Sequence, residues 1–393
     1  MHCSPRWTKR SAAAGAWWTR RVHDHDKGVQ SVTPPDTSGP FRLWAFGDAH
    51  VGTDKQFGRS SLAEAISQSE FGGAEGGPSF EWDIAVDVGD MSGAHHSLPD
   101  DAEGEEVRKQ FSALRTHRRE DVYSVSGNHD RNGLSDPDGW WWQKWIDPLG
   151  EHTESSGVDS AARTYPVEGN WEHYSFRVGN LLFLMMSDRN EPTQAKGRGP
   201  LGGNPGGVVS AETFDWFTST VDANPDAIIV AVHHYVLKDT TVASGEWEGV
   251  RKDAAGRWEE HYHRPFEEGT PHGASYLYWV GSKPDSAAFE SFLAERPGRV
   301  QMWLAGHTHT NPDDDHGGKT HIERRWGTWF LNVASLSRHH MPRTTLPISR
   351  LLTFTPGSTD VRVRCYLHTS QHAPQGWYPK AERTLRLDRP FSW

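Results

Sequence analysis

Short apolar runs, most of which end in glycine or in polar residues, recur along this chain and constrain its fold more than any other feature. The runs cover residues 43–46, 84–88, 122–125, 181–186, 227–232, 300–305 and 329–333. Their length and bulk are typical of strands that are buried on both faces of a sheet. Helical patterns lie between several of the runs, and an alternation of strands with helices predicts an α/β fold.

The expected helices are marked by capping residues at their starts. Ser61 and Glu64 have the spacing of a capping box, in which two side chains satisfy free backbone N–H groups. Ser210 and Asp285 each stand where the first residue before a helix is expected, and Pro297 stands where the last of these helices should end. These positions predict helices between the strands rather than long loops.

Two antiparallel hairpins are predicted in addition to the crossovers. One turns at Gly179 and Asn180, and the other turns at Pro356 and Gly357. Antiparallel pairs combined with crossovers predict two sheets, or one mixed sheet, between flanking helices.

Asp, Asn and His side chains follow five of the apolar runs directly. The five clusters are Gly47-Asp48-Ala49-His50, Gly89-Asp90, Gly127-Asn128-His129-Asp130, His233-His234 and Gly306-His307-Thr308-His309. In open α/β sheets, ligands bind beyond the carboxyl ends of the strands. We therefore expect the five clusters to meet at one edge, where the glycines let the backbone turn sharply.

The residue types in these clusters suit divalent cations. Carboxylates, an amide oxygen and neutral imidazoles are ligands for Mn, Fe or Zn. Asp48 and His50 are two residues apart and share one side of an extended segment, as do His307 and His309. Asp90 is the candidate for a carboxylate that bridges two metals. A pair of cations about 3.5–4 Å apart clamps a phosphate and lowers the pKa of a bound water.

As an ordered set, the five clusters resemble the motifs of the calcineurin-like metallophosphoesterase superfamily, over about residues 42–310. The resemblance implies a four-layer α/β/β/α sandwich of two mixed sheets flanked by helices. It also implies two bound divalent metal ions. Among Mn, Fe and Zn, Mn is expected to support activity best in vitro. The ligands that it implies are Asp48, His50 and His309 for the first metal and Asn128, His233 and His307 for the second, with Asp90 as the bridge.

The resemblance also implies in-line hydrolysis of a phosphate-ester substrate by a metal-bound hydroxide. His129 would hydrogen-bond to the phosphate or protonate the leaving oxygen, and Asp130 would orient His129. Two further residues are predicted to bind substrate. Arg189 follows a strand and can hold a phosphate with two hydrogen bonds, and His234 adjoins a predicted ligand.

Three functions stay open at this point. A phosphodiesterase is preferred over a phosphomonoesterase, because His50 and His129 are both present, as in many diesterase branches. A metal-dependent nuclease is the first alternative, but the net charge of -11 makes nucleic acid the less favoured partner. A non-catalytic interaction module on the same fold is the second alternative, and it is expected to lack ligands that are all present here. The oligomeric state is open.

The domain organisation follows from composition along the chain. Residues 1–40 are predicted to be a disordered or poorly ordered leader, and residues 41–393 are predicted to be one domain with a cap inserted at about 238–280. No apolar run is long enough to span a membrane. The absence of a secretory signal and the presence of only 2 cysteines predict a cytoplasmic location.

Two further clusters each have two interpretations. Trp140-Trp141-Trp142 and Trp145 can stack nucleobases, but packing in a core is favoured. The acidic stretch at residues 313–316 can hold a cation, but a solvated turn is favoured.

Overall fold

Two seven-stranded sheets form the centre of the computed structural model, and the apolar runs of the sequence supply their central strands. The structure describes residues 37–93, 99–130, 139–189, 207–245, 250–252, 258–260, 276–277, 279–281, 283–284, 287–338 and 345–393. These residues all lie within one unit, Thr33–Trp393. Residues 1–36 of the predicted leader lie outside the described residues, so the leader stays a prediction.

The first sheet has the strand order β18-β17-β16-β1-β2-β3, with β19 paired to β17. Its strands are β1 (Phe41–Phe46), β2 (Ile84–Asp87), β3 (Val122–Ser124), β16 (Ile348–Phe354), β17 (Asp360–Leu367), β18 (Gly376–Trp377) and β19 (Arg383–Arg386). Strands β1, β2 and β3 are parallel, and β16 and β17 form the hairpin predicted at Pro356 and Gly357. The carboxyl ends of β1, β2 and β3 therefore lie at the same edge.

The second sheet has the strand order β14-β15-β13-β8-β6-β5-β4. Its strands are β4 (Glu168–Gly169), β5 (His173–Val178), β6 (Leu181–Met186), β8 (Ile228–His233), β13 (Val300–Ala305), β14 (Ile322–Arg325) and β15 (Thr328–Asn332). Strands β6, β8, β13 and β15 are parallel, and β5 and β6 form the hairpin predicted at Gly179 and Asn180.

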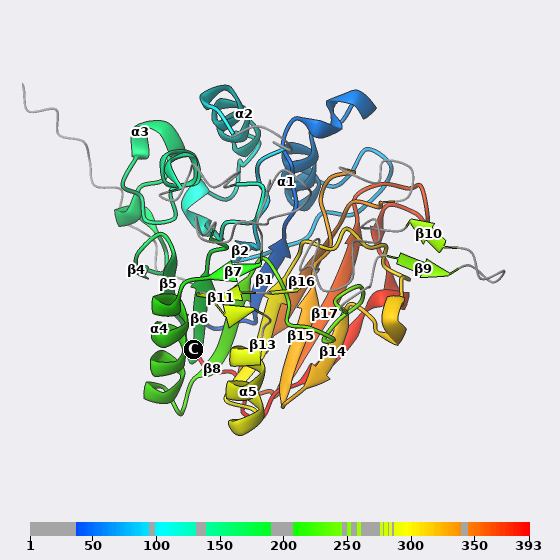
Figure 1. The fold of residues 1–393 in the computed structure, drawn as a ribbon. Coiled ribbons are helices and arrows are strands. Elements are labelled where there is room, and N and C mark those ends of the chain that lie inside the picture. The colour runs from blue at the N-terminus through cyan, green and yellow to red at the C-terminus, as the bar shows by residue number, and fades with distance from the viewer. Residues whose placement is uncertain are drawn as a thin grey trace, which may run out of the picture. The chain divides into compact units, whose positions relative to one another are not determined.

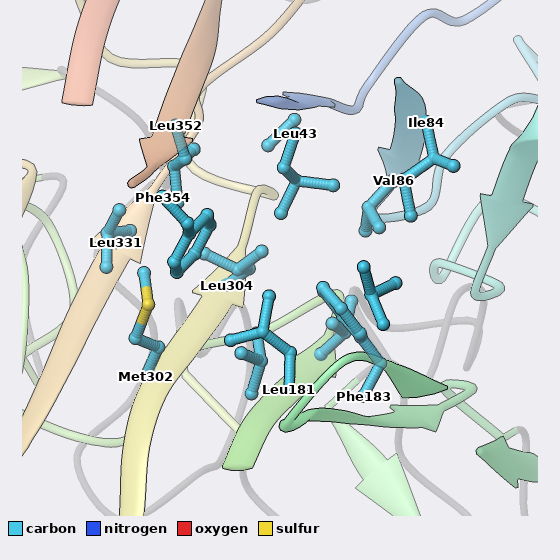
Figure 2. Packing of buried hydrophobic residues seen from close by; sticks show 14 of the residues in the cluster. Leu43, Ile84, Val86, Leu181, Phe183, Met302, Leu304, Leu331, Leu352 and Phe354 are labelled. Atoms are coloured by element: carbon cyan, nitrogen blue, oxygen red, sulfur yellow. The ribbon is translucent and has the colours of Figure 1, made fainter. Parts of the chain in front are cut away.

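Helices cover the outer face of each sheet (Figure 1). Helices α1 (Ser61–Phe71) and α2 (Asp101–Phe111) pack on the first sheet, and α4 (Ala211–Ala223) and α5 (Ala287–Glu295) pack on the second. Between the sheets lies an apolar core to which both contribute, with Leu43 and Val86 from one side and Phe183 and Leu304 from the other (Figure 2). The predicted four-layer α/β/β/α arrangement of two mixed sheets is confirmed.

Smaller elements complete the described chain. Two small sheets pair β7 (Val208–Val209), β11 (Trp279–Val280) and β12 (Lys283–Pro284), and β9 (Val250–Lys252) with β10 (Trp258–Glu260). The short helical segments are α3 (Thr153–Ser156), η1 (Thr53–Phe57), η2 (Arg119–Asp121), η3 (Trp142–Ile146), η4 (Ser160–Ala162), η5 (His316–Gly318) and η6 (Pro379–Ala381). Most of the predicted cap at 238–280 lies outside the described residues and stays a prediction. In the described part of the chain, no helix combines the length and apolar character that crossing a membrane requires.

The helix starts differ from the prediction in one place. Ser210 caps α4 as predicted, and its hydroxyl accepts a hydrogen bond from the backbone N–H of Thr213. In α1 the cap position belongs to Ser60, whose N–H donates to Glu64 at 3.0 Å. The hydroxyl of Ser61 instead donates to the carbonyl oxygen of Ala49, in the loop after β1. The predicted cap at Asp285 lies outside the described residues.

The tryptophan cluster packs inside the molecule. Trp141, Trp142 and Trp145 are buried in the apolar core between the first sheet, α1 and α2, whereas Trp140 is 41% exposed. The indole N–H groups of Trp141 and Trp145 donate to Asp100 and Asp101 at the start of α2. The packing interpretation is confirmed for Trp141, Trp142 and Trp145, whose buried rings have no open face on which a base could stack.

His368 is a buried histidine whose protonation should affect stability. Its ring nitrogens lie 2.6 Å from Gln68 Oε1 and 2.9 Å from Ser349 Oγ. Burial lowers its pKa to about 3. The unfolded chain binds a proton here below about pH 6.5, whereas the folded chain does not. The stability that this group contributes is therefore complete above that pH and is lost as the pH falls towards the folded pKa.

We predict that His368→Gln reduces the pH dependence of unfolding. Between about pH 6.5 and pH 5, the wild type should lose on the order of 2 kcal/mol through this residue. Chemical denaturation of the chelated protein at both pH values measures the loss, which should be smaller in His368→Gln. His372→Gln, at an exposed position, is the matched control and should follow the wild type. An equal loss in all three proteins would contradict the prediction.

Candidate metal centre

The loops after β1 and β2 are joined by backbone hydrogen bonds that continue the pairing of the two strands. The N–H of Asp48 donates to the carbonyl of Gly89 at 2.8 Å, and the N–H of His50 donates to the carbonyl of Asp90 at 3.0 Å. The loop after β13 joins them, because the N–H of His307 donates to the Asp48 carboxylate at 3.0–3.1 Å. The two sheets thus meet at these loops.

Four of the predicted ligands have a left-handed backbone. The φ angles are 52° at Asp48, 37° at His50, 59° at Asp90 and 68° at His307. Such a conformation costs a non-glycine residue on the order of 1–3 kcal/mol, and it persists only where the surrounding structure imposes it. The sharp turns aim these side chains back across the edge of the sheets, so the cost is concentrated at the candidate site.

Two glycines are required because carboxylates lie against their backbone. A Cβ atom at Gly127 would collide with Oδ1 of Asp90, and a Cβ atom at Gly306 would collide with Oδ2 of Asp48. Each glycine therefore lets the loop of one motif approach the carboxylate of another.

Three overlapping groups of buried side chains place their candidate ligand atoms within 4.8 Å of one another. The groups are Asp48, His50 and His309, then His50, Asp90 and His129, and finally Asp90, His234 and His307. Asp90 and His50 each belong to two groups. This overlap is the arrangement needed for two cations side by side with a shared carboxylate between them.

The imidazoles of His50 and His234 fit a metal because their outer nitrogens are already used. Nδ1 of His50 lies 2.7 Å from the carbonyl oxygen of Ser92, and Nδ1 of His234 lies 2.9 Å from that of Val88. A carbonyl can only accept, so in the neutral ring Nδ1 carries the proton and Nε2 has the lone pair. Metal-binding histidines use this same support.

These lone pairs point at other acceptors. Nε2 of His50 lies 3.2 Å from Nε2 of His309, which is 2.9 Å from Oδ1 of Asp48. Nε2 of His234 lies 3.1 Å from Oδ2 of Asp90 without the alignment of a hydrogen bond. Acceptors that converge in a buried site need positive charge between them, which a proton or a cation can supply. The donor set therefore fits two divalent cations.

The pKa shifts around Asp90 report the same demand for positive charge. Burial by itself would raise the pKa of Asp90, but the imidazoles of His234 and His129 lower it below its usual range. Burial likewise opposes protonation of His234, yet Asp90 raises the pKa of His234 to about 10. Metal binding displaces such protons from ligands.

A sequence model of the calcineurin-like phosphoesterase family matches residues 41–311, which is more than half of the chain. The chain belongs to the calcineurin-like phosphoesterase family. No curated protein matches the sequence. The predicted membership is confirmed, and the matched residues include every candidate metal ligand.

Solved structures with a similar chain path include three Vps29 proteins. A single mutant of Vps29 from Entamoeba histolytica is 12% identical with a TM-score of 0.31, and the match covers 88% of this chain and 98% of that chain. Vacuolar protein sorting 29 from Cryptosporidium parvum is 12% identical with a TM-score of 0.32, covering 89% and 100%. Chaetomium thermophilum Vps29 is 8% identical with a TM-score of 0.30, covering 89% and 100%. Similarities at these identities and TM-scores do not indicate a shared function or a shared site.

The structure distinguishes the two neighbouring histidines, His233 and His234. Nδ1 of His233 accepts the N–H of Tyr235 at 3.0 Å and also lies 3.3 Å from the carbonyl oxygen of Tyr235. Nε2 of His233 lies 3.9 Å from Oδ1 of Asp188, and the second-metal role predicted for His233 stays a prediction. Burial lowers the pKa of His233 to about 3 and keeps the ring neutral. His234, predicted to bind substrate, lies among the ligands instead.

Asn128 contacts a residue that the motifs did not indicate. Its amide oxygen accepts a hydrogen bond from the hydroxyl of Tyr235 at 2.9 Å, and its Nδ2 has no partner. Tyr235 also packs on the ring of His307, with ring centroids 4.0 Å apart. An amide oxygen has a second lone pair, so Tyr235 positions Asn128 and leaves it able to bind a metal.

His129 and Asp130 have different contacts in the structure. The imidazole of His129 lies beside that of His50, with ring centroids 4.8 Å apart, and the backbone N–H of His129 donates to Asp90. The carboxylate of Asp130 accepts the backbone N–H groups of Asp90, Ser92 and Gly127 at 2.7–2.9 Å. These contacts tie the Gly89-Asp90 cluster to the Gly127–Asp130 cluster, and the predicted role of Asp130 in orienting His129 stays a prediction.

Arg189 is held by an acidic neighbour. Its Nη1 lies 2.9 Å from Oε1 of Glu172, and its backbone N–H donates to Val208. The phosphate contact predicted for Arg189 stays a prediction. In the structure the guanidinium of Arg189 forms an ion pair with the carboxylate of Glu172.

Two supporting residues were missed by the motif analysis. Ser92 accepts the proton of His50 through its carbonyl, and its hydroxyl donates to Glu103 of α2 at 3.0 Å. Tyr235 directly follows the two histidines, and a hydroxyl beside a ligand pair is a weak signal that could have drawn attention to it. Ser92 acts through its backbone, which no sequence pattern reports.

We predict that His234→Ala weakens Mn²⁺ binding much more than His233→Ala. Removal of supporting residues costs 10–100-fold in metal affinity, so loss of a direct ligand should cost about 100-fold or more. Mn²⁺ titration of both purified variants, followed by metal analysis after dialysis, measures the difference. His233→Ala is the matched control at the neighbouring buried position. The opposite ranking would restore the original assignment.

Proposed function

We propose that this phosphoesterase hydrolyses phosphoric esters with two divalent cations, and that it prefers diesters to monoesters. The observation that supports this proposal is the sharing of Asp90 between two groups of buried candidate ligands. Family membership supports the reaction class. A cytoplasmic location belongs to the same proposal.

The protein would hold the cations with residues from both sheets. The candidate ligands are Asp48, His50, Asp90, Asn128, His234, His307 and His309. When bound, two such cations supply an activated water and offset the negative charge of the phosphate oxygens. The surrounding carbonyls orient the imidazoles and fix the proton of the neutral ring on Nδ1, and the strained loops hold the carboxylates in place before substrate arrives.

His129 is the candidate for proton transfer to the leaving group. Its ring stands at the margin of the ligand cluster, beside His50 and Asp90. The hydrogen bond from its N–H to Asp90 fixes the backbone that carries the ring. A histidine in this place can donate a proton to the oxygen that departs from phosphorus.

The two alternatives make different demands on the molecule. A nuclease needs a basic surface for the phosphate backbone, and the net charge of -11 does not favour one. An interaction module has no need of strained loops that converge on buried ligands, whereas catalysis does. The hydrolase proposal uses both features of the site.

We predict that chelation abolishes hydrolysis of bis-p-nitrophenyl phosphate and that Mn²⁺ restores it. The rate should exceed that with p-nitrophenyl phosphate, and DNA should be cleaved more slowly than either. Release of p-nitrophenolate and gel analysis of DNA provide the measurements. Asp90→Asn should not recover with Mn²⁺, because the shared carboxylate is lost, while Asp388→Asn at an exposed site should recover fully. Turnover that persists after chelation would refute the metal requirement.

We predict that His129→Gln lowers kcat while Mn²⁺ content stays unchanged. Loss of a general acid costs about 10²-fold or more. The loss should be larger for a cyclic nucleotide, whose alkoxide needs a proton, than for bis-p-nitrophenyl phosphate, whose phenolate leaves readily. His152→Gln, at a partly buried position outside the candidate site, is the control. Equal losses on both substrates would assign His129 to binding rather than to proton transfer.

A further inference from the structure

Arg350 occupies an inward-facing position on β16. Ile348, Leu352 and Phe354 lie on the same face of the strand as Arg350 and contribute to the buried apolar clusters. Its neighbours across the sheet are Ala45 on β1 and Cys365 on β17, and the arginine is 1% exposed. A buried charge without compensation is costly, so an arginine among core residues requires a partner.

The hydrogen bonds of Arg350 leave one side of its guanidinium unused. Nη1 donates to the carbonyl oxygen of Ala381 at 3.3 Å. Nε and Nη2 have no hydrogen-bond partner, and no described carboxylate forms an ion pair with the group. Nε–H and Nη2–H lie side by side on a guanidinium and point in parallel. They are the fork that binds two oxygens of one carboxylate or phosphate group.

Arg350 is one of the residues that line a pocket of about 230 Å³. Its walls come from β16, from the start of β14, from η6 and from residues 312–315, which follow the cluster that contains His307 and His309. Besides Arg350, the lining includes Thr320, His321, Lys380 and Arg383. The volume is sufficient for a small oxyanion with a few waters.

The acidic residues of the pocket do not compensate Arg350. Asp313 accepts from Lys380 Nζ at 2.7 Å and from the hydroxyl of Tyr378 at 2.8 Å. Asp314 accepts the backbone N–H of Asn311 at 2.8 Å. Asp313 is therefore engaged with its own cation, and the charge of Arg350 stays uncompensated. Asp314 and Asp315 oppose an anion, which points to modest affinity.

We propose that this pocket binds a small oxyanion, through two parallel hydrogen bonds from Nε and Nη2 of Arg350. The group recognised is a phosphate, a sulfate or a carboxylate, which share a pair of oxygens at the spacing of the fork. The site uses no side chain of the metal centre, and it does not depend on the proposed function.

The pocket nevertheless adjoins the metal-binding loop. Nε2 of His321 lies 2.9 Å from the hydroxyl oxygen of Thr310, the residue after His309. The pocket wall continues from this segment at Pro312. An anion on Arg350 would therefore lie close to the segment that follows the loop with two candidate ligands, His307 and His309.

Anomalous diffraction from crystals of the full chain, loaded with Mn²⁺ and soaked in selenate, tests the proposal directly. We expect a selenium peak at hydrogen-bond distance from Nε and Nη2 of Arg350, in addition to any peak at the metal centre. Sulfate and acetate soaks distinguish a tetrahedral anion from a carboxylate. Selenate at the metal centre alone, or only water against Arg350, would overturn the proposal.

Thermal denaturation in solution provides the second test. Sulfate at constant ionic strength should raise the melting temperature of the Mn²⁺-loaded wild type. Arg350→Lys keeps the charge but loses the fork, and its apparent sulfate affinity should fall at least about tenfold. Arg350→Met should lose the response at this site, and Arg386→Met, an exposed arginine, should keep it. Wild-type responses in both Arg350 variants would overturn the proposal, and Arg350→Lys still decides if Arg350→Met fails to fold.

Discussion

The burial of Asp48 and Asp90 among histidines is the constraint on which the arrangement of this protein depends. The loops that carry these two carboxylates are joined by backbone hydrogen bonds, and both aspartate side chains are almost fully buried. Burial of such charges is unfavourable unless positive charge and hydrogen-bond donors surround them. The backbone amides of His129 and His307 supply part of this compensation. The remaining demand is for the cations that the imidazole lone pairs also require.

The fold meets this demand through the way its parallel strands end. Strands β1 and β2 in one sheet and β8 and β13 in the other deliver their loops to a common edge. The apolar core between the sheets holds the strands in register (Figure 2), and left-handed residues turn the side chains inwards. Packing energy from the core thus offsets the strain and desolvation at the site. The same logic makes Arg350 conspicuous, because it is a core charge for which the described residues supply a carbonyl but no carboxylate.

The histidine pair after β8 shows where motif reasoning reaches its limit. Successive side chains at the end of a strand point to opposite sides, so only one of His233 and His234 can face Asp90. The sequence places both beside the site but contains no information about the strand's rotation. The structure places His234, together with His307, beside Asp90. Asp130 is a similar case, since its carboxylate is used by backbone amides that no side-chain pattern reveals.

The sequence by itself determined the α/β class, the central strands, the two hairpins and the clusters that bear ligands. These features follow from local patterns of apolar residues, glycines and turns, which act over a few neighbouring positions. The tertiary structure alone decided which imidazole joins Asp90, that Tyr235 supports Asn128, and that Glu172 holds Arg189. Those outcomes depend on distances between segments that are far apart in the chain. Local sequence patterns do not distinguish the residues concerned, whereas tertiary packing and burial do.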